Sequence, residues 1–359
     1  MNLSLGIVGL PNVGKSTLFN ALTKQSVPAE NYPFNTIDPN VGVVPVADKR
    51  LQKIVEISKP TKITSAVVEF VDIAGLVKGA ANGEGLGNKF LSNIKEVTAI
   101  VHLVRAFQNN NITHVENSIN SLRDLELINT ELILKDIETI ENRIKSLKSK
   151  TRFDKDAAEH VTFMEELLNH LNQIKLAIDF QPKVSERVEI ERKSLFLLTD
   201  KPTIYLINVE DELASKAKKA IQEIVGNRSI ITMDVKTESE LASMSDEDRK
   251  MFMDDLNISQ TGLEKLTLEA YKILGLISFF TEGPEEVKAW TIKEGSTAPI
   301  AAGTIHTDFE KKFIAADICY YEDFIAAGDW NKAKAIGKVR LEGKNYIVKD
   351  GDIIIFKHG

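Results

Sequence analysis

The sequence predicts an α/β protein: a parallel sheet with helices on both faces, a helical hairpin inserted into it, and a small α+β domain after it. Three observations predict this class. Short apolar segments alternate with helical patterns over residues 1–114 and 201–275, a long helical repeat without glycine fills residues 115–200, and turn-rich alternating segments fill residues 276–359. We therefore expect three domains with these bounds, the first interrupted in the sequence by the second.

The first part contains five short apolar segments that indicate buried strands. The earliest, residues 3–8, is bounded by glycine and leads into a helix over residues 17–24, where apolar side chains recur on one side. The other four strands are expected at residues 67–71, 99–104, 203–207 and 229–233. Strands that alternate with helices pair in parallel, which predicts the parallel sheet.

The inserted part is predicted to be an antiparallel helical hairpin. Apolar residues recur at helical spacing from 119 to 147 and again from 161 to 178, and the two helices are joined near residues 151–156. In the last part we expect a small α+β domain, with short strands at residues 287–292, 313–320, 346–348 and 353–356.

Composition excludes several classes of protein. The net charge of −7 rules out a surface coated in positive charge, so any nucleic-acid contact must be local. The single cysteine, Cys319, rules out an internal disulfide and a cysteine metal cage, and we expect it to be a small core residue. No apolar run reaches the roughly 18 residues of a membrane helix. With no signal peptide at the start, we expect a cytoplasmic protein that does not contact membranes.

Residues 9–16, GLPNVGKS, fit the phosphate-loop pattern G-x-x-x-x-G-K-[ST] between a predicted strand and a predicted helix. Gly9 and Gly14 let the backbone wrap phosphate oxygens, and the helix N-terminus favours negative charge. Lys15 would reach the β- and γ-phosphates, and the Ser16 hydroxyl would ligate Mg²⁺. The sequence therefore predicts a P-loop NTPase; the alternative is an ordinary strand-loop-helix turn with a surface lysine.

Further Mg²⁺ and phosphate ligands are expected after the second strand and in a loop before it. Asp72 can hold Mg²⁺ through water, and the Gly75 amide can contact the γ-phosphate. Thr36 lies in a loop that contains prolines, where a switch threonine could close over Mg²⁺ and the γ-phosphate. Residues 75–87 carry five glycines and could reorder when a phosphate leaves. For both loops the alternative is a plain surface loop.

The segment Asn208-Val209-Glu210-Asp211 ends the fourth strand of the first part. GTPases usually carry Asn-Lys-x-Asp here, and the aspartate reads guanine, but this chain lacks the lysine. The alternative is an Asx turn that opens the next helix.

Several motifs together resemble the Obg-like ATPases, the YchF family of the translation-factor class of P-loop NTPases. The resemblance covers essentially the whole chain, and it implies a G domain, an inserted coiled-coil hairpin and a C-terminal TGS domain. It rests on residues 9–17 (GLPNVGKST), 72–80 (DIAGLVKGA), 83–91 (GEGLGNKFL), 298–303 (APIAAG), 305–311 (IHTDFEK) and 346–352 (YIVKDGD).

The resemblance implies a preference for ATP over GTP, linked in the family to Asn-x-x-Glu in place of Asn-Lys-x-Asp. This chain has Asp211 at the fourth position, which keeps a GTPase of the Obg-like class open as an alternative. Phe107 matches an aromatic that packs near adenine, and Asn208 with the Val209 backbone would face the base edge. The implied ATP-binding residues are Asn12, Val13, Gly14, Lys15, Ser16, Thr17, Gly75, Phe107, Asn208 and Val209, with Ser16, Thr36 and Asp72 at Mg²⁺.

Hydrolysis is expected to be slow without a partner. Many GTPases place a water-orienting glutamine directly after D-x-x-G, but this chain has Leu76, which cannot hydrogen-bond water. Lys15 and His114 are the expected catalytic residues. His114 matches a family histidine and could orient water; the alternative is a solvated histidine at a helix start. Asn12 resembles an asparagine that binds K⁺ in related NTPases.

Two basic patches suggest contact with structured RNA. Residues Arg143–Lys155, at the predicted hairpin tip, and Lys332–Lys349 each carry six basic residues against one acidic residue. The alternative for each is a solvated surface without a partner. The resemblance implies ribosome binding, so we expect a monomeric, ATP-hydrolysing switch on ribosomes. A nucleotide-sensing, ribosome-binding protein or holdase with incidental hydrolysis is the second hypothesis.

Overall fold

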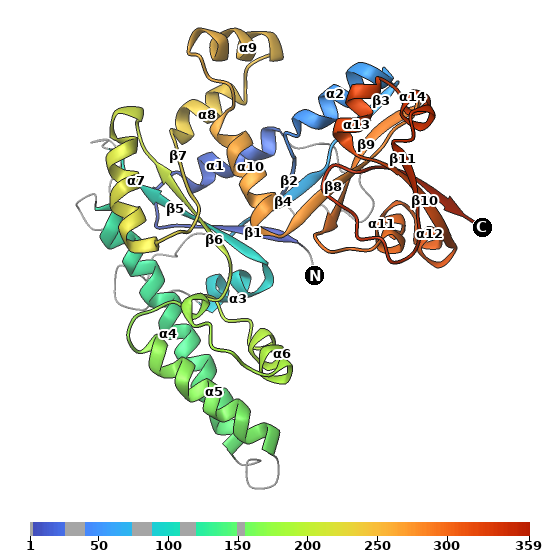
Figure 1. Cartoon of the computed structure of the whole chain (residues 1–359). Helices are drawn as coiled ribbons and strands as arrows, with labels where there is room; N and C mark the ends of the chain where they lie inside the picture. The colour runs from blue at the N-terminus through green and yellow to red at the C-terminus, as the bar shows by residue number, and fades with distance from the viewer. Residues whose placement is uncertain (1–2, 26–39, 74–87, 108–119, 149–154) are drawn as a thin grey trace. The chain divides into compact units, whose positions relative to one another are not determined.

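The computed structural model describes residues 3–25, 40–73, 88–107, 120–148 and 155–359 (Figure 1). Contacts divide the chain into two compact units. The first unit comprises residues 1–24, 36–42 and 69–262, and the second comprises residues 25–35, 43–68 and 263–359. Within the described ranges, none of the helices combines the length and the apolar composition that a membrane span requires.

A six-stranded sheet with the order β2-β4-β1-β5-β6-β7 forms the centre of the first unit. The neighbours β4-β1, β1-β5, β5-β6 and β6-β7 all pair in parallel, which confirms the predicted α/β class. Every residue of β1 and β5 is buried, as expected for central strands with helices on both faces. The strands are β1 (Ser4–Val8), β2 (Val41–Pro45), β4 (Val67–Asp72), β5 (Ala99–Arg105), β6 (Thr203–Asn208) and β7 (Ile230–Met233).

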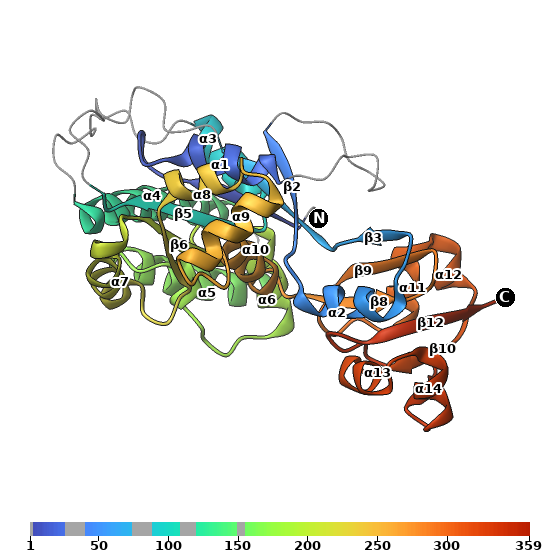
Figure 2. The ribbon, with the colours of Figure 1, turned by 90° about the horizontal axis from the view of Figure 1, so that it is seen from above.

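Helices cover both faces of this sheet. Helices α1 and α8 pack together on one face, while α4 packs against α7 on the other (Figures 1 and 2). These helices pack on the sheet through apolar faces; α1, for example, buries Leu18, Phe19 and Leu22. Outside the hairpin region, the helices of this unit are α1 (Lys15–Lys24), α3 (Asn88–Glu96), α7 (Asp211–Val225), α8 (Val235–Leu241) and α9 (Asp246–Asp255). Helix α2 (Lys49–Ser58) and, apart from its first residue, helix α10 (Gly262–Ile273) belong to the second unit.

The hairpin consists of α4 (Ser121–Lys148) and α5 (Lys155–Leu171), as predicted. The expectation that the second helix continues to residue 178 is wrong. The backbone at Ile174 is left-handed, with φ 58°, and a short 3₁₀ turn follows at Ala177–Asp179. Tertiary hydrogen bonds replace helical ones there, because Ile178 N donates to Thr199 O at 3.2 Å. A further helix, α6 (Glu186–Ser194), has Ser185 as its N-cap and was not predicted.

The second unit is an α+β domain around a sheet with the order β11-β10-β12-β8-β9-β3. Its core packs Phe279, Ile292 and Phe313 against the alanine face of α11. Its strands are β3 (Lys62–Thr64), β8 (Leu276–Thr281), β9 (Glu286–Lys293), β10 (Phe313–Cys319), β11 (Val339–Glu342) and β12 (Ile353–His358). Its short helices are α11 (Ala298–Ile305), α12 (Thr307–Lys311), α13 (Tyr321–Ala327) and α14 (Trp330–Ala335).

Several details of this unit differ from the sequence prediction, which did not include strands β8 and β11. Residues 346–348 form no strand; only Ile347 makes an isolated bridge, to Thr297. Residues 43–68, expected in the first part, pack in the second unit, where β3 pairs with β9 in parallel. Arg50 of α2 also holds Asp350 through two hydrogen bonds of 2.9 and 3.0 Å.

Candidate nucleotide site

The loop between β1 and α1 has the close backbone packing of a phosphate-binding loop. Gly14 has φ 101°, and a Cβ added to it would lie 2.6 Å from the Asn208 side-chain nitrogen. A Cβ at Gly9 would lie 2.7 Å from the Leu103 carbonyl oxygen. Only glycine therefore fits either position. Leu18 N donates to Gly14 O at 2.9 Å, so α1 begins directly from this loop and its N-terminus faces the same space.

Lys15 and Asp72 meet beside this loop. The Lys15 ammonium lies 2.5 Å from one carboxylate oxygen of Asp72, and both side chains are largely buried. The contact follows from sheet order, because β1 and β4 are parallel neighbours with Ile7 opposite Asp72. Ser16, one residue further along α1, is exposed. A hydroxyl and a carboxylate are oxygen ligands of the kind that Mg²⁺ prefers, so the residues present fit this cation.

An open pocket of about 950 Å³ lies beside the loop and α1. Its size is that of a site for a nucleotide-sized ligand. It brings together seven residues predicted for ATP, namely Asn12, Gly14, Lys15, Ser16, Thr17, Phe107 and Asn208. The remaining lining residues are Leu10, Pro11, Glu210, Asp234, Val235 and Lys236.

Asn208 holds the wall of this pocket together. Its side-chain nitrogen donates to Val13 O at 3.0 Å, and its side-chain oxygen accepts from Val235 N at 3.1 Å. Val209 is buried, and its N–H donates to Met233 O at 3.0 Å. Each end of the Asn208 side-chain amide thus has one partner within the protein, and the Val209 N–H is also used within the protein.

The sequence analysis did not find the pocket residues that follow β7. Asp234 caps α8, since its carboxylate accepts from Lys236 N at 2.9 Å, and Val235 and Lys236 extend the wall. Their position in the sequence could have identified them, because they follow the carboxyl end of a predicted parallel strand, and ligands bind there in open α/β sheets. Thr36, Gly75, Leu76 and His114 lie outside the described residues, as does the Asp211 side chain.

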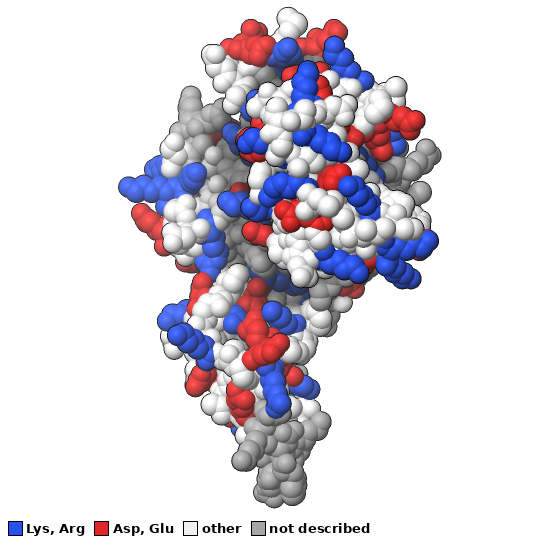
Figure 3. Space-filling model, turned by 45° about the vertical axis from the view of Figure 1, so that its right-hand side comes forward, with Lys and Arg blue, Asp and Glu red and all other residues white. Residues whose placement is uncertain are grey.

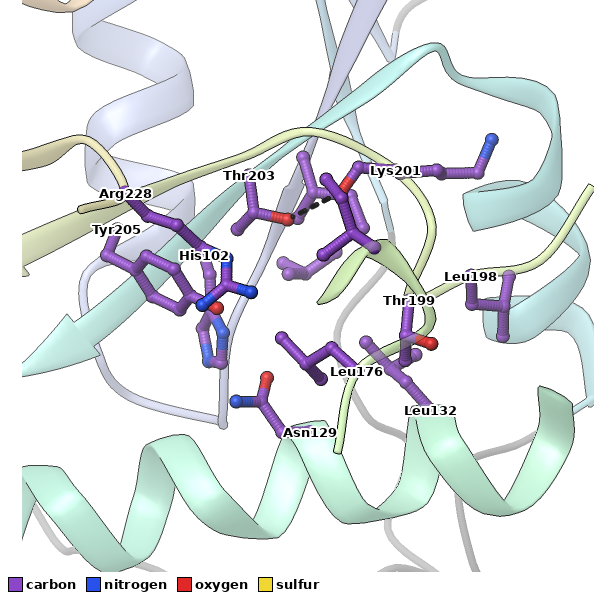
Figure 4. Close-up of a pocket in the computed structure, with 13 residues that line it drawn as sticks. His102, Asn129, Leu132, Leu176, Leu198, Thr199, Lys201, Thr203, Tyr205 and Arg228 are labelled. Atoms are coloured by element: carbon purple, nitrogen blue, oxygen red, sulfur yellow. Dashed lines mark hydrogen bonds between the residues drawn. The ribbon is translucent and has the colours of Figure 1, made fainter. Parts of the chain in front are cut away.

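A second cavity lies between the sheet and the hairpin (Figure 4). Its volume of about 20 Å³ has room for about one water molecule, which excludes a nucleotide. His102 of β5 and Tyr205 of β6 line it together with Asn129 of α4, which hydrogen-bonds the tyrosine. The His102 side chain is buried, and its Nε2 has no hydrogen-bond partner within the described ranges. Burial lowers the pKa of His102 to about 4.

Acidic residues from other segments neutralise part of the basic patch on the hairpin. Arg143 pairs with Glu191 at 2.6 Å, and Lys148 pairs with Glu165 at 2.8 Å. Figure 3 shows basic and acidic side chains side by side on the hairpin. Residues 149–154 lie outside the described residues. The described part of this patch is therefore less positive than the sequence count suggests.

The basic patch of the second unit is also neutralised in part. Lys332 pairs with Asp329, and Lys338 pairs with Asp323, each at 3.0 Å. The Arg340 guanidinium lies 4.0 Å from the centre of the Tyr320 ring, which makes a cation–π contact. Lys334 and Lys344 are exposed and keep the patch positive.

Comparisons with known proteins agree over the whole chain. Residues 4–136 match the family described as 50S ribosome-binding GTPase, and residues 276–359 match the YchF GTPase C-terminal family, described as a protein of unknown function (DUF933). The Ribosome-binding ATPase YchF of Bacillus subtilis (strain 168) is 48% identical over 99% of each chain. That of Escherichia coli O157:H7 is 47% identical, with the same coverage. The solved structure of the Schizosaccharomyces pombe YchF GTPase is 40% identical, with a TM-score of 0.89 over 99% of this chain and 98% of that one.

Proposed function

This chain belongs to the YchF family, and we propose that it is a magnesium-dependent ATPase that acts as a regulatory switch on ribosomes. Two of its relatives are named ribosome-binding ATPases over the same length, and its first part matches a family of ribosome-binding GTPases. The chain is accordingly a ribosome-associated nucleotide-binding protein and a nucleotide hydrolase. The base preference, the cation and the contact surfaces are proposals that go beyond these names.

One observation supports the hydrolase chemistry above all others: Lys15, Ser16 and Asp72 lie together beside a glycine loop at a helix N-terminus. In the bound state we expect Lys15 to exchange Asp72 for the β- and γ-phosphate oxygens, with the loop amides around the same phosphates. Ser16 and Asp72 would then hold Mg²⁺, with Thr36 closing over it. Mg²⁺ would supply positive charge to the phosphates as the bond to the γ-phosphate breaks.

The attacking water needs an orienting group, because Leu76 cannot hydrogen-bond it. By family resemblance we assign this role to His114, and to the Gly75 amide a contact with the γ-phosphate. Asn12 is the candidate ligand for K⁺. Its left-handed backbone, with φ 62°, places it in the turn of the phosphate loop. Intrinsic hydrolysis is then slow, and a partner accelerates it.

The proposed base is adenine, packed near Phe107. The pocket supports this placement, since Phe107 lines it together with the residues of the turn after β7. The Asn208 side chain acts on the base indirectly, by holding Val13 and Val235 in place. A GTPase of the Obg-like class is the second candidate, and Asp211 favours it because an aspartate at this position reads guanine in other GTPases.

Ribosome contact is assigned to Arg143–Lys155 on the hairpin and to Lys332–Lys349 in the C-terminal domain, which resembles a TGS domain. Lys145, Lys334 and Lys344 remain exposed and supply the charge that phosphate groups would meet. We propose that the protein works as a monomer in the cytoplasm, where ribosomes are. Three domains were proposed from the sequence. In this proposal residues 1–114 with 201–275 bind and hydrolyse the nucleotide, and residues 115–200 and 276–359 contact the ribosome.

Multiple-turnover ATP hydrolysis with and without purified ribosomes tests this proposal. We expect ribosomes to raise the rate well above the intrinsic value, and Lys15→Ala to abolish both rates while the protein stays folded. Equal rates with and without ribosomes would contradict the switch. They would favour the nucleotide-sensing, ribosome-binding protein or holdase, for which hydrolysis is incidental.

A further inference from the structure

Arg105, at the end of β5, is the largest fully buried side chain among the described residues, with an exposed fraction of 0%. A guanidinium is costly to remove from water, so a buried one is retained only where its contacts compensate. Burial lowers the pKa of Arg105, and the nearby Asp124 carboxylate opposes this shift. None of the roles proposed above for nucleotide binding or hydrolysis uses this residue.

The contacts of Arg105 lead directly to the base end of the nucleotide pocket. Its guanidinium carbon lies 4.4 Å from the centre of the Phe107 ring, and its Nε donates to Phe107 O at 3.3 Å. The side chain therefore contacts Phe107 through both the ring and the backbone. Because Phe107 lines the pocket, the arginine lies behind the ring that would meet a purine base.

The same segment is tied to the first turn of the hairpin. Ser121 Oγ of α4 donates to Arg105 O at 2.8 Å, and Asp124 is buried near the guanidinium. On the other side, Ala106 N donates to Asn208 O at 2.8 Å. Residues 105–107 thus connect the hairpin root, the Phe107 ring and the asparagine that holds the phosphate loop.

We propose that Arg105 is a positioning residue for the base site: it holds the Phe107 ring in place to stack on a purine, and the hairpin root holds Arg105, since Ser121 donates to its carbonyl oxygen and Asp124 is buried near its charge. The inference rests on the proposed function, which places the base at Phe107. A planar guanidinium can stack on the back of an aromatic ring, whereas the compact ammonium of lysine cannot hold the ring in the same way. The residues that support the base site would therefore include residues of α4, although none of the described lining residues of the pocket belongs to α4.

Binding titrations on the full chain, with Mg²⁺ present, test the proposal with two ligands. A non-hydrolysable ATP analogue has a base, and inorganic tripolyphosphate does not. Arg105→Lys is expected to weaken binding of the analogue about tenfold and to leave the affinity for tripolyphosphate unchanged. Phe107→Leu should have the same effect, and the double variant should lose no more than either single variant. A residue that only supports the fold would weaken both ligands together.

The matched control is Arg123→Lys, because Arg123 is an arginine of α4 that pairs with Asp124 at 3.0 Å and lies outside the segment 105–107. It should bind both ligands like the parent. Asp124→Asn is the second variant in case Arg105→Lys does not fold, and it should weaken the analogue about threefold without affecting tripolyphosphate.

The positioning role would be overturned if Arg105→Lys lowered the affinity for both ligands equally. It would also be overturned if the affinity losses of the two single variants added up in the double variant. If Phe107→Leu weakens the analogue but Arg105→Lys does not, the inference fails and the proposed function stands. If Phe107→Leu has no effect, the proposed base placement fails as well.

Discussion

Lowering the pH from 7 to 4 is expected to remove a stabilising contribution to the first unit that comes from His102. Its pKa of about 4 lies below the ordinary 6.5 because burial disfavours the imidazolium. The unfolded chain therefore binds the proton first. The stabilisation is complete above pH 6.5 and is lost as the pH falls towards 4. The difference in pKa corresponds to about 3 kcal/mol of unfolding free energy, at about 1.4 kcal/mol per pKa unit.

The variant His102→Gln removes this titration and keeps a polar side chain beside Asn129 and Tyr205. Urea unfolding from pH 7 to pH 4 should then show a smaller loss of stability in the variant than in the parent, by about 3 kcal/mol. Far-UV circular dichroism is the suitable probe, because both tryptophans, Trp290 and Trp330, belong to the second unit and would not report on the first.

His306→Gln provides the control, because this histidine lies in the second unit and is exposed. Because this change lies outside the first unit, the loss of stability that we assign to His102 should persist in the variant. Parallel profiles for the parent and His102→Gln would refute the reasoning, since they would mean that His102 accepts its proton in the folded state as easily as in the unfolded chain.

Three further outcomes follow from the nucleotide site and the hairpin. Gly14→Ala should abolish nucleotide binding in a titration, because the new Cβ would lie 2.6 Å from the Asn208 nitrogen at a backbone φ of 101°; binding within twofold of the parent would contradict this. Asp72→Asn should raise the Mg²⁺ concentration at which ATP binding is half-maximal by about tenfold or more, since the carboxylate that holds Mg²⁺ is lost; an unchanged Mg²⁺ midpoint would exclude the role. Lys148→Glu breaks the 2.8 Å pair with Glu165 and reverses a charge, so co-sedimentation with ribosomes should fall several-fold at unchanged ATP affinity; unchanged co-sedimentation would remove this residue from the contact.

The phosphate loop could be predicted from the sequence because its determinants are contiguous. Gly9, Gly14, Lys15 and Ser16 lie within one short segment between a strand and a helix, and local spacing defines the pattern. The parallel sheet was predictable for a similar reason, since short apolar strands alternate with helices. The position of Asp72 beside Lys15 was also predictable, because Asp72 stands at the end of β4 and β4 pairs in parallel with β1.

What the sequence missed depends on contacts between distant segments. The pairing of β3 with β9 joins residues more than two hundred positions apart, and β3 is only three residues long. The end of α5 depends on hydrogen bonds to Thr199, which a helical repeat does not reveal. The charge of the hairpin depends on Glu165 and Glu191, which are outside the basic run. In each case tertiary contacts override a local pattern.

The most direct test of the central claim is a pair of binding titrations with fluorescent ATP and GTP analogues in the presence of Mg²⁺. Our account predicts tighter binding of ATP, with the adenine packed near Phe107. Tighter binding of GTP would contradict it, because it would mean that Asp211 provides guanine recognition even though Val209 replaces the usual lysine.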